Sequence, residues 1–403
     1  MELLMLSYAR SLVKLLVWNQ LTAIMTSIAA LAVIGVIAGT AVPALLRRRR
    51  KINHPAMSRL PLGLLLFCLG DWVLLQTLPR LQLSFSKDIS SCLTASFIVR
   101  LFLFFGLIAA ALPACWLKRR QSKRTRGTAA LFIAVNLAFS AIQVDAYIVE
   151  PLMVETTHIT LASADLDPDA PPVRIVHLTD THIERLSYRE RTVIDKVNAL
   201  QPDIVVFTGD YINTTYFGDA TAHEHFREFV AQIEAPYGIY ATRGTVEPSP
   251  DTMAHLIEGT EIVWLEQEAV TVNVRGQKVM LVGVNCDHND GDAVRLDQAM
   301  AGIPRDAFTL LLFHSPDLIH EAAAHGVDLY LGGHTHGGQL RLPFYGAIVT
   351  MSKYGKQYEA GLFQEGGTTM YISRGIGFEG YSMPRARFLC PPEIVSIELK
   401  GTQ

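Results

Sequence analysis

Cysteine is scarce in this sequence, with 5 residues in a chain of 403. They lie far apart and form no CxxC pair, at Cys68, Cys92, Cys115, Cys286 and Cys390. This spacing excludes a zinc-finger module and a disulfide framework. A single bridge between Cys286 and Cys390, the two nearest the C-terminus, remains open.

Acidic residues are almost absent from the first 150 positions. That region holds 5 Asp and Glu residues against 17 Lys and Arg residues. Residues 151–403 hold 33 Asp and Glu residues against 18 Lys and Arg residues. The net charges are therefore +12 and −15, which agree with the overall −3. Such asymmetry indicates two regions in different surroundings, so we predict domains at 1–150 and 151–403. The acidic second region should repel long polyanions, and nucleic acid is not an expected partner.

The first region also lacks long polar stretches. The chain is 50% hydrophobic with a mean hydropathy of +0.25, and apolar runs occupy about 20–46, 60–79, 95–117 and 128–148. Each run is close to the ~20 residues that a helix needs to cross a bilayer. We therefore predict a four-helix transmembrane region and a multi-pass location in the inner or plasma membrane. A cleaved signal peptide would be one short apolar core and does not fit; buried helices of a large soluble core are the alternative.

Two basic clusters set the expected orientation. One spans residues 47–51, between the first two apolar runs, and the other spans 118–126, between the last two. By the positive-inside rule both belong on the cytoplasmic side. The region 151–403 is then expected on the periplasmic or extracellular side. Binding of the same clusters to a polyanion is the alternative.

Three charged residues lie inside the apolar runs, at Asp71, Arg100 and Asp145. Ionisable residues within a membrane are functional candidates. We expect Arg100 and Asp145 near the outer interface, where they could pair with each other or extend toward water. Asp71 lies deeper and is given no role. A membrane sensor or a transport-associated protein therefore stays among the alternatives.

From about residue 152, short β-branched runs alternate with helical stretches, which is typical of an α/β domain. Polar side chains follow the ends of these runs. They are Asp180 and His182, Asp210, His314, and the pair His334 and His336. Ligands of open α/β sheets bind beyond the carboxyl ends of the strands. We therefore expect these side chains to gather at one edge.

This set holds two carboxylates and four imidazoles, without a thiolate. It suits manganese, iron, zinc or cobalt rather than calcium, and we expect manganese. Six ligands on one ion would leave no open position, whereas two divalent ions ~3.5–4 Å apart that share a carboxylate leave room for water and substrate. Taken singly, each residue could instead be a strand-end cap or a turn former.

In this order the motifs resemble the calcineurin-like metallophosphoesterases, in particular their membrane-anchored or exported bacterial branch. The family pattern is DxH, GDxx(N/D), GNH(D/E), a lone His and GHxH. The chain has Asp180-Thr181-His182, Gly209-Asp210-Tyr211-Ile212-Asn213, His314 and Gly333-His334-Thr335-His336 in the matching places. GGQ at 337–339, SRGIG at 373–377 and CPPEI at 390–394 also resemble this branch.

The resemblance implies an α/β four-layer sandwich, with two mixed β-sheets flanked by helices and two metal ions between strand ends. Carried over residue by residue, it assigns the first ion to Asp180, His182 and His336, the second to His314 and His334, and the bridge to Asp210. It implies hydrolysis of phosphodiester or pyrophosphate bonds by metal-activated water. A tethered site would suit a phosphorylated small molecule or a lipid-linked substrate, so the expected partners are such a substrate and the bilayer.

The third motif departs from the family pattern, because GNH(D/E) is replaced by Gly244-Thr245-Val246-Glu247. Thr245 offers a hydroxyl where the family's asparagine supplies a carbonyl oxygen to the second metal. Val246 stands where the family's histidine protonates the leaving oxygen, so the catalytic acid is unknown; Glu247 and His288 are candidates. One hypothesis is an enzyme whose substrates need no acid. The other is a degenerate domain that binds metal or phosphate without turnover.

Overall fold

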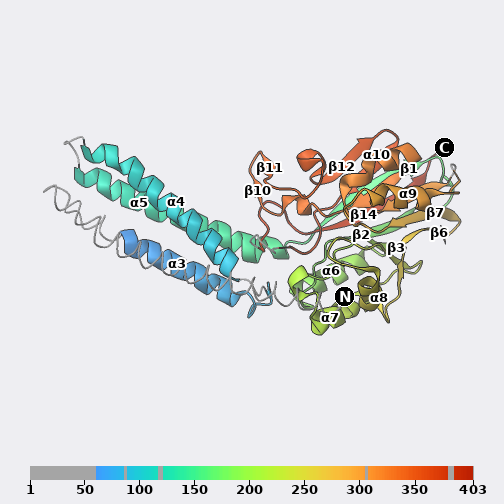
Figure 1. Cartoon of the computed structure of the whole chain (residues 1–403), viewed down its shortest axis with the longest axis horizontal. Helices are drawn as coiled ribbons and strands as arrows, with labels where there is room; N and C mark the ends of the chain where they lie inside the picture. The colour runs from blue at the N-terminus through green and yellow to red at the C-terminus, as the bar shows by residue number, and fades with distance from the viewer. Residues whose placement is uncertain (1–59, 86–88, 117–120, 305–306, 380–384, 403) are drawn as a thin grey trace, which may run out of the picture. The chain divides into compact units, whose positions relative to one another are not determined.

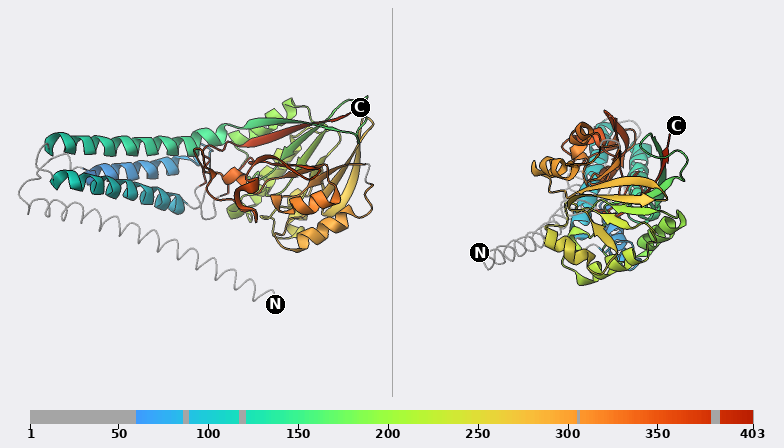
Figure 2. Two further views of the ribbon diagram at one scale, coloured as in Figure 1. Left: turned by 90° about the horizontal axis from the view of Figure 1, so that it is seen from above. Right: turned by 90° about the vertical axis from the view of Figure 1, so that its right-hand side faces the viewer.

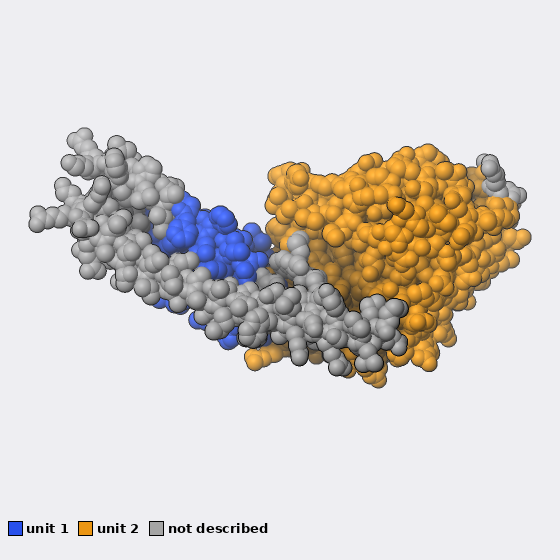
Figure 3. Space-filling view, in the orientation of Figure 1, with its two compact units in different colours: residues 1–77, 87–144, 382–384 blue, residues 78–86, 145–381, 385–403 orange. Residues whose placement is uncertain are grey.

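The computed structural model describes residues 60–85, 89–116, 121–304, 307–379 and 385–402. The chain divides into two compact units (Figure 3). Unit 1 takes in residues 1–77, 87–144 and 382–384, and unit 2 takes in residues 78–86, 145–381 and 385–403. The apolar run predicted at 20–46 and the basic cluster at 47–51 lie outside the described residues.

Unit 1 is helical in its described part, with α3 Leu60–Thr77, α4 Ile89–Trp116 and α5 Gln121–Val144 (Figure 1). Among the described residues, two helical stretches are long and apolar enough to cross a membrane, Leu60–Thr77 and Gly127–Leu152, and a shorter apolar stretch is Cys92–Leu107. These stretches overlap three of the predicted runs. The four-helix transmembrane region stays a prediction.

A buried ion pair lies at the centre of unit 1. The Arg100 guanidinium donates to both oxygens of Asp71, at 2.6 and 2.5 Å, and its other donors reach oxygens of α5, on Asn136, Ser140 and Gln143. Arg100 is fully buried. The expectation that Arg100 pairs with Asp145 or extends toward water is therefore wrong. A charge surrounded by apolar side chains needs a partner, and Asp71 on α3 is that partner.

In its described residues, unit 2 contains two six-stranded sheets and one short hairpin. The first sheet has the order β1 Glu155–Ser163, β14 Glu393–Gly401, β2 Val173–Leu178, β3 Ile204–Phe207, β4 Ile239–Ala241 and β5 Ile262–Trp264. The second has the order β12 Gly361–Glu365, β13 Thr368–Ile372, β9 Leu329–Gly332, β8 Phe308–Leu312, β7 Gln277–Val284 and β6 Gln267–Val274. The hairpin pairs β10 Arg341–Leu342 with β11 Gly346–Ala347.

Both sheets are mixed. β2 to β5 run parallel, whereas β14 pairs parallel with β1 and antiparallel with β2. In the second sheet β13, β9, β8 and β7 are parallel, and the two outer strands are antiparallel to their neighbours. The carboxyl ends of β2, β3, β8 and β9 are the strand ends at which the sequence predicts the site.

Helices cover the outer faces of the two sheets (Figure 2). The longer helices are α6 Tyr188–Ala199, α7 Ala220–Ala231, α8 Pro250–Ile257, α9 Gly291–Met300 and α10 Ile319–His325. Short helical turns are η3 Asp145–Val149, η4 Glu150–Leu152, η5 Thr214–Tyr216, η6 Pro316–Leu318, η7 His336–Gly338 and η8 Gly355–Tyr358.

The alternation of side chains along the strands separates the layers. On β3, Ile204 and Val206 belong to the core between the two sheets, whereas Val205 and Phe207 belong to the core under α6, α7 and α8. β8 alternates in the same way between the inter-sheet core and the core under α9 and α10. Strands buried on both faces are continuous hydrophobic runs. The predicted arrangement of two mixed sheets flanked by helices is confirmed.

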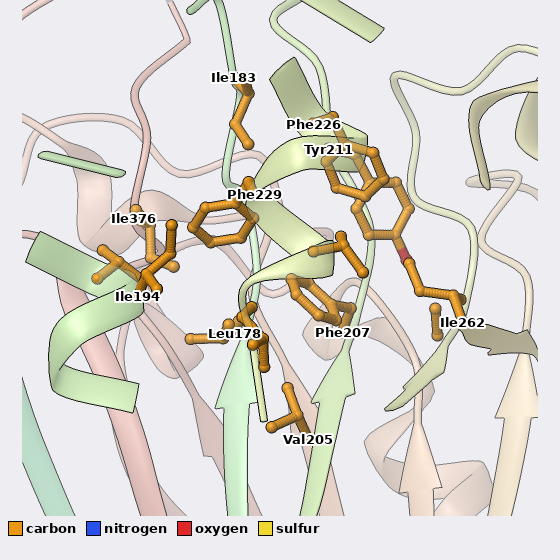
Figure 4. Packing of buried hydrophobic residues seen from close by; sticks show 14 of the residues in the cluster. Leu178, Ile183, Ile194, Val205, Phe207, Tyr211, Phe226, Phe229, Ile262 and Ile376 are labelled. Carbon is orange, nitrogen blue, oxygen red and sulfur yellow. The ribbon is translucent and has the colours of Figure 1, made fainter. Parts of the chain in front are cut away.

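Packing under α7 holds the loop that follows β3. Phe207 lies against Phe229 of α7, and the ring of Tyr211 packs against Phe226 with centroids 5.2 Å apart (Figure 4). The Tyr211 hydroxyl donates a 2.5 Å hydrogen bond to the carbonyl of Thr242, just after β4. Asp210, the residue before Tyr211, is therefore placed by rigid neighbours.

Candidate metal centre

The structure brings all six residues predicted as metal ligands together. Asp180 and His182 follow β2, Asp210 follows β3, His314 follows β8, and His334 and His336 follow β9. All six are buried. Their nitrogen and oxygen atoms form two groups, Asp180 with His182 and His336, and Asp210 with His314 and His334, within each of which the atoms lie within 4.8 Å of one another.

The first group draws on the ends of both sheets. Nε2 of His182 lies 3.1 Å from Nε2 of His336, and the latter atom lies 3.3 Å from Oδ1 of Asp180. The two imidazole rings are stacked, with centroids 4.9 Å apart. Two nitrogens and one oxygen therefore converge on one point.

The second group lies beside the first. Oδ2 of Asp210 and Nδ1 of His334 each lie 3.1 Å from Nε2 of His314. The same Asp210 oxygen lies 3.8 Å from Nε2 of His182 in the first group. Asp210 therefore stands between the two groups, at the place where a shared carboxylate would stand.

Backbone carbonyls fix the tautomers of two histidines. Nδ1–H of His314 donates a 2.7 Å hydrogen bond to the carbonyl of Thr208, and Nε2–H of His334 donates a 3.0 Å bond to the carbonyl of Met351. In the neutral rings, the two inward nitrogens then carry lone pairs. Lone pairs that face each other at 3.1 Å repel unless a cation lies with them. The donor set fits a divalent ion, and histidines that donate their other N–H to a carbonyl are typical metal ligands.

The pKa shifts of the charged groups in the site also favour a bound cation. Burial acts to lower the pKa of His314, but the Asp210 carboxylate outweighs it and raises the pKa to about 9. Burial, together with the neighbouring His314, lowers the pKa of His334 to about 3. Burial also raises the pKa of Asp180. A positive charge beside Asp210 is thus favoured, and without a metal a proton on His314 takes that place.

The backbone at these positions is unusual. Asp180, His182, Asp210, His334 and His336 all have positive φ angles, between 40° and 67°. This region is rare for residues other than glycine and costs on the order of 1–3 kcal/mol at each position. Such conformations cluster at functional sites because the surrounding structure must hold them.

Glycines make the close approach of the loops possible. Gly209 has a φ of +102°, and a Cβ atom there would lie 2.4 Å from Cα of Gly244. A Cβ atom on Gly333 would lie 2.1 Å from Oδ2 of Asp180. Any side chain at either position would displace a carboxylate or the loop that carries it.

The third motif lies next to Asp210. The Thr245 hydroxyl is 3.4 Å from both Asp210 carboxylate oxygens, and the backbone N–H of Val246 donates to Oδ1 at 2.9 Å. Glu247 is fully buried and accepts hydrogen bonds from the backbone N–H groups of Asp210, Tyr211 and Gly244. Glu247 therefore ties the loops together and has no surface to offer a substrate.

His288 is placed differently. Its ring packs edge-on against the ring of His334, with centroids 4.4 Å apart, and its side chain is 34% exposed. It lines a cavity of about 640 Å³ together with Asp317, Met351 and Lys353. Of the two acid candidates from the sequence, His288 is the one with open space beside the second group.

Several residues that contact the predicted metal ligands could not be recognised from the sequence. The carbonyls of Thr208 and Met351 orient two imidazoles, and backbone groups at these positions leave no trace in residue type. Oε2 of Glu379 lies 3.4 Å from Nδ1 of His182. Glu379 lies two residues after SRGIG, and nothing in its spacing distinguishes it from other surface carboxylates. Cys286 and Cys390 are both free thiols, so no bridge joins them.

Comparison with known proteins gives one consistent result. Residues 173–338 match the sequence profile described as Calcineurin-like phosphoesterase. The chain is 33% identical over 269 residues to metallophosphoesterase YkuE of Bacillus subtilis (strain 168), which covers 63% of this chain and 88% of that protein. It is 30% identical over 240 residues to phosphodiesterase YaeI of Escherichia coli (strain K12), covering 57% and 83%. It is 24% identical over 276 residues to UDP-2,3-diacylglucosamine pyrophosphatase LpxG of Chlamydia trachomatis serovar D, covering 55% and 82%.

Proposed function

This chain belongs to the calcineurin-like metallophosphoesterase family of metal-dependent hydrolases, and we propose that it cleaves phosphodiester or pyrophosphate bonds of a membrane-borne substrate. The observation that carries the proposal is the convergence of two carboxylates and four imidazoles in two adjacent groups. Relatives are described as a phosphodiesterase and as a pyrophosphatase of a diacylated sugar nucleotide, which are the two bond types proposed here.

In this proposal Asp180, His182 and His336 hold one divalent ion, His314 and His334 hold a second, and Asp210 serves both. Two such ions lower the pKa of bound water and neutralise charge on phosphoryl oxygens. The chain's own part is to hold donors in place. Thr208 and Met351 orient two imidazoles through their carbonyls, and Glu247 fixes the Asp210 loop through three backbone N–H groups. Manganese is our proposal for the metal.

A membrane location is part of the proposal. Its support is the pair of apolar stretches Leu60–Thr77 and Gly127–Leu152, together with the basic residues that flank them in the sequence. We propose four membrane-spanning helices, with unit 2 on the periplasmic or extracellular side. A substrate that is itself a lipid would then reach the site without leaving the membrane surface.

The test is metal analysis of the purified full chain, paired with assays of a soluble aryl phosphodiester and of a lipid-linked pyrophosphate with added manganese. Asp210→Ala should lose metal from both positions, and His334→Ala should lose it from one, with turnover falling at least ~10³-fold because the charge stabilisation is gone. His325→Ala, on α10 and paired with Asp297, is the matched control. Equal metal content in all four proteins would contradict the assignment. Two bound ions with no turnover of any ester would favour the degenerate domain.

A further inference from the structure

An exposed apolar hairpin stands out on unit 2. The segment 341–351, here called the apolar hairpin, contains β10 and β11 (Figure 1). Six of its large hydrophobic side chains face solvent, at Leu342, Phe344, Tyr345, Ile348, Val349 and Met351. Phe344, at its tip, is completely exposed. Contiguous apolar surface of this kind marks an interaction site in a folded protein.

The base of the apolar hairpin is held firmly, so its exposure is not that of a loose loop. Arg341 donates one hydrogen bond to the carbonyl of Gly337, at 2.9 Å, and another to Oε1 of Glu359, at 2.7 Å. The other oxygen of Glu359 accepts the backbone N–H of Ala347 at 3.1 Å. One carboxylate thus joins both strands of the hairpin. The apolar side chains are presented outward by an ordered polar base.

Cations border the apolar tip. The ammonium of Lys356 lies 3.5 Å from the ring centroid of Tyr345 and donates to the carbonyl of the same residue. Lys353 has a half-exposed side chain just beyond Met351. Aromatic and aliphatic side chains beside lysines are the composition of segments that lie in the interface of an anionic bilayer. Two partly exposed lysines beside the apolar tip favour anionic headgroups over neutral ones.

Within unit 2, the apolar hairpin also lies close to residues 145–152, which are the last part of a candidate span. The stretch Gly127–Leu152 ends in η3 and η4, where Glu150 accepts the backbone N–H of Leu389 at 2.7 Å. One residue earlier, Phe388 exchanges backbone hydrogen bonds of 3.0 Å with Gln339 and Arg341, at the root of the hairpin. The adjacent residues Phe388 and Leu389 therefore connect the root of the hairpin, through hydrogen bonds, to Glu150 near the end of that stretch.

The far end of the hairpin reaches the metal centre, since the carbonyl of Met351 accepts the His334 N–H. From these contacts we propose that the apolar hairpin inserts its tip into the surface of an anionic phospholipid bilayer. It lies between the end of an apolar stretch and the second ligand group. The consequence for turnover rests on the proposed function: a phosphoester in that bilayer would be presented to the site beside His334.

The first test follows insertion directly. Phe344→Cys, labelled with an environment-sensitive fluorophore in the full chain, is placed in nanodiscs of phosphatidylcholine and phosphatidylglycerol that contain spin-labelled lipid. Its fluorescence should be quenched, and more weakly so when phosphatidylglycerol is omitted. Val263→Cys, an exposed apolar position on the edge strand β5, is the matched control and should not be quenched. The unaltered chain, labelled in parallel, gives the background from native cysteines.

The second test separates this inference from the proposed function. Phe344→Asp and Ile348→Asp should raise KM for a phosphodiester lipid in nanodiscs by about tenfold or more, because a charge opposes insertion. Both should leave kcat/KM for a soluble aryl phosphodiester within about twofold, and Val263→Asp should change neither. Absence of quenching at residue 344 with normal soluble turnover overturns the inference alone. Quenching with no turnover of any ester overturns the proposed function alone.

A second copy of the chain is the competing occupant of the hairpin. In that case the fluorescence of the label at residue 344 would change with protein concentration in detergent, where no bilayer is present. That result, without quenching by spin-labelled lipid, also overturns the inference.

Discussion

Thr245 and Val246 are the side chains at which this site differs most from its family's pattern. The Thr245 hydroxyl lies 3.4 Å from the Asp210 carboxylate, so it faces the second ligand group, but on a shorter arm than asparagine. Val246 supplies its backbone N–H to Asp210 and has no proton to give a leaving group. The consequence is chemical, because charge on the departing oxygen must be stabilised without an acid at this position.

We expect the rate to fall steeply as the pKa of the leaving group rises, so pyrophosphate bonds and aryl esters should be cleaved far faster than alkyl esters. Thr245→Asn combined with Val246→His should restore alkyl esters preferentially, by up to ~10²–10⁴-fold. The measurement is kcat/KM across a series of phosphodiesters with graded leaving groups.

His288→Asn is the informative companion in that series. If the unaltered enzyme shows a flat dependence and His288→Asn makes it steep, His288 donates the proton and the expectation is contradicted. If both are steep, His288 has a packing role against His334.

The convergence of the six proposed ligands could be predicted from the sequence because strands buried on both faces end abruptly in polar residues, and parallel strands bring those ends to one edge. The residues that contact these proposed ligands could not be predicted from the sequence. Thr208 and Met351 act through backbone carbonyls, and Glu379 reaches His182 through a loop whose path depends on the whole fold. The Asp71–Arg100 pair was also missed, because helix packing rather than sequence position decides which charges meet.

The strand-end loops are the elements that carry the proposed metal ligands, and their glycines set how closely the loops approach one another. Gly209→Ala should destabilise unit 2 by at least ~1–3 kcal/mol, because a left-handed conformation and a contact of 2.4 Å with Gly244 must both be relieved. It should also lower metal content, since Asp210 is the next residue. Thermal unfolding and metal analysis check this. Gly218→Ala, with ordinary φ and nothing within 4 Å of its Cβ, should be neutral.

At the opposite ends of the strands, an ion pair ties the two sheets together. Asp203, just before β3, accepts hydrogen bonds from the Arg174 backbone at 2.8 Å and from Arg275, in the turn between β6 and β7, at 2.7 Å. Burial acts to raise the pKa of Asp203, but the hydrogen bonds from Arg275 and Arg174 outweigh it, and the pKa is lowered.

A lowered pKa means that this pair stabilises the fold above the unfolded value of about 3.9, and that the stabilisation is lost as the pH falls through the folded pKa. Asp203→Asn should therefore lower the stability by about 1 kcal/mol near neutral pH. The difference from the unaltered chain should shrink in acid below the unfolded pKa. Thermal midpoints of both proteins, measured near neutral pH and in acid below the unfolded pKa, give this difference in stability. Asp290→Asn, at an exposed position, is the control. If the difference in stability between Asp203→Asn and the unaltered chain is the same at both pH values, the charge of Asp203 does not contribute to stability.

At the scale of the whole molecule, the chain joins an apolar helical unit to an acidic phosphoesterase unit. The Arg100 network gives α3, α4 and α5 of unit 1 one specific set of polar contacts, and its donors are all occupied by protein oxygens. A fully satisfied pair of this kind fixes helix packing and leaves no open ligand site. This argues against a transport role at Asp71.

The anchoring proposal has a direct test in intact cells. A cysteine introduced at Lys278, which is exposed on unit 2, should react with a membrane-impermeant thiol reagent added from outside. A cysteine introduced at Arg120 should react only after the membrane is permeabilised, because the basic cluster 118–126 belongs on the cytoplasmic side. The unaltered chain reports the native cysteines. The reverse pattern of labelling would invert the proposed orientation.

The position of β14 governs when this protein can fold. β14 lies between β1 and β2, pairing with both, although β1 starts at Glu155 and β14 only at Glu393. During synthesis the first two strands of the sheet must therefore wait for more than two hundred residues before their shared neighbour emerges. β1, whose one partner in the sheet is β14, stays unpaired throughout that interval. The unit closes late, only after β14 has been synthesised, and until then an unpaired strand edge is exposed to aggregation and needs protection.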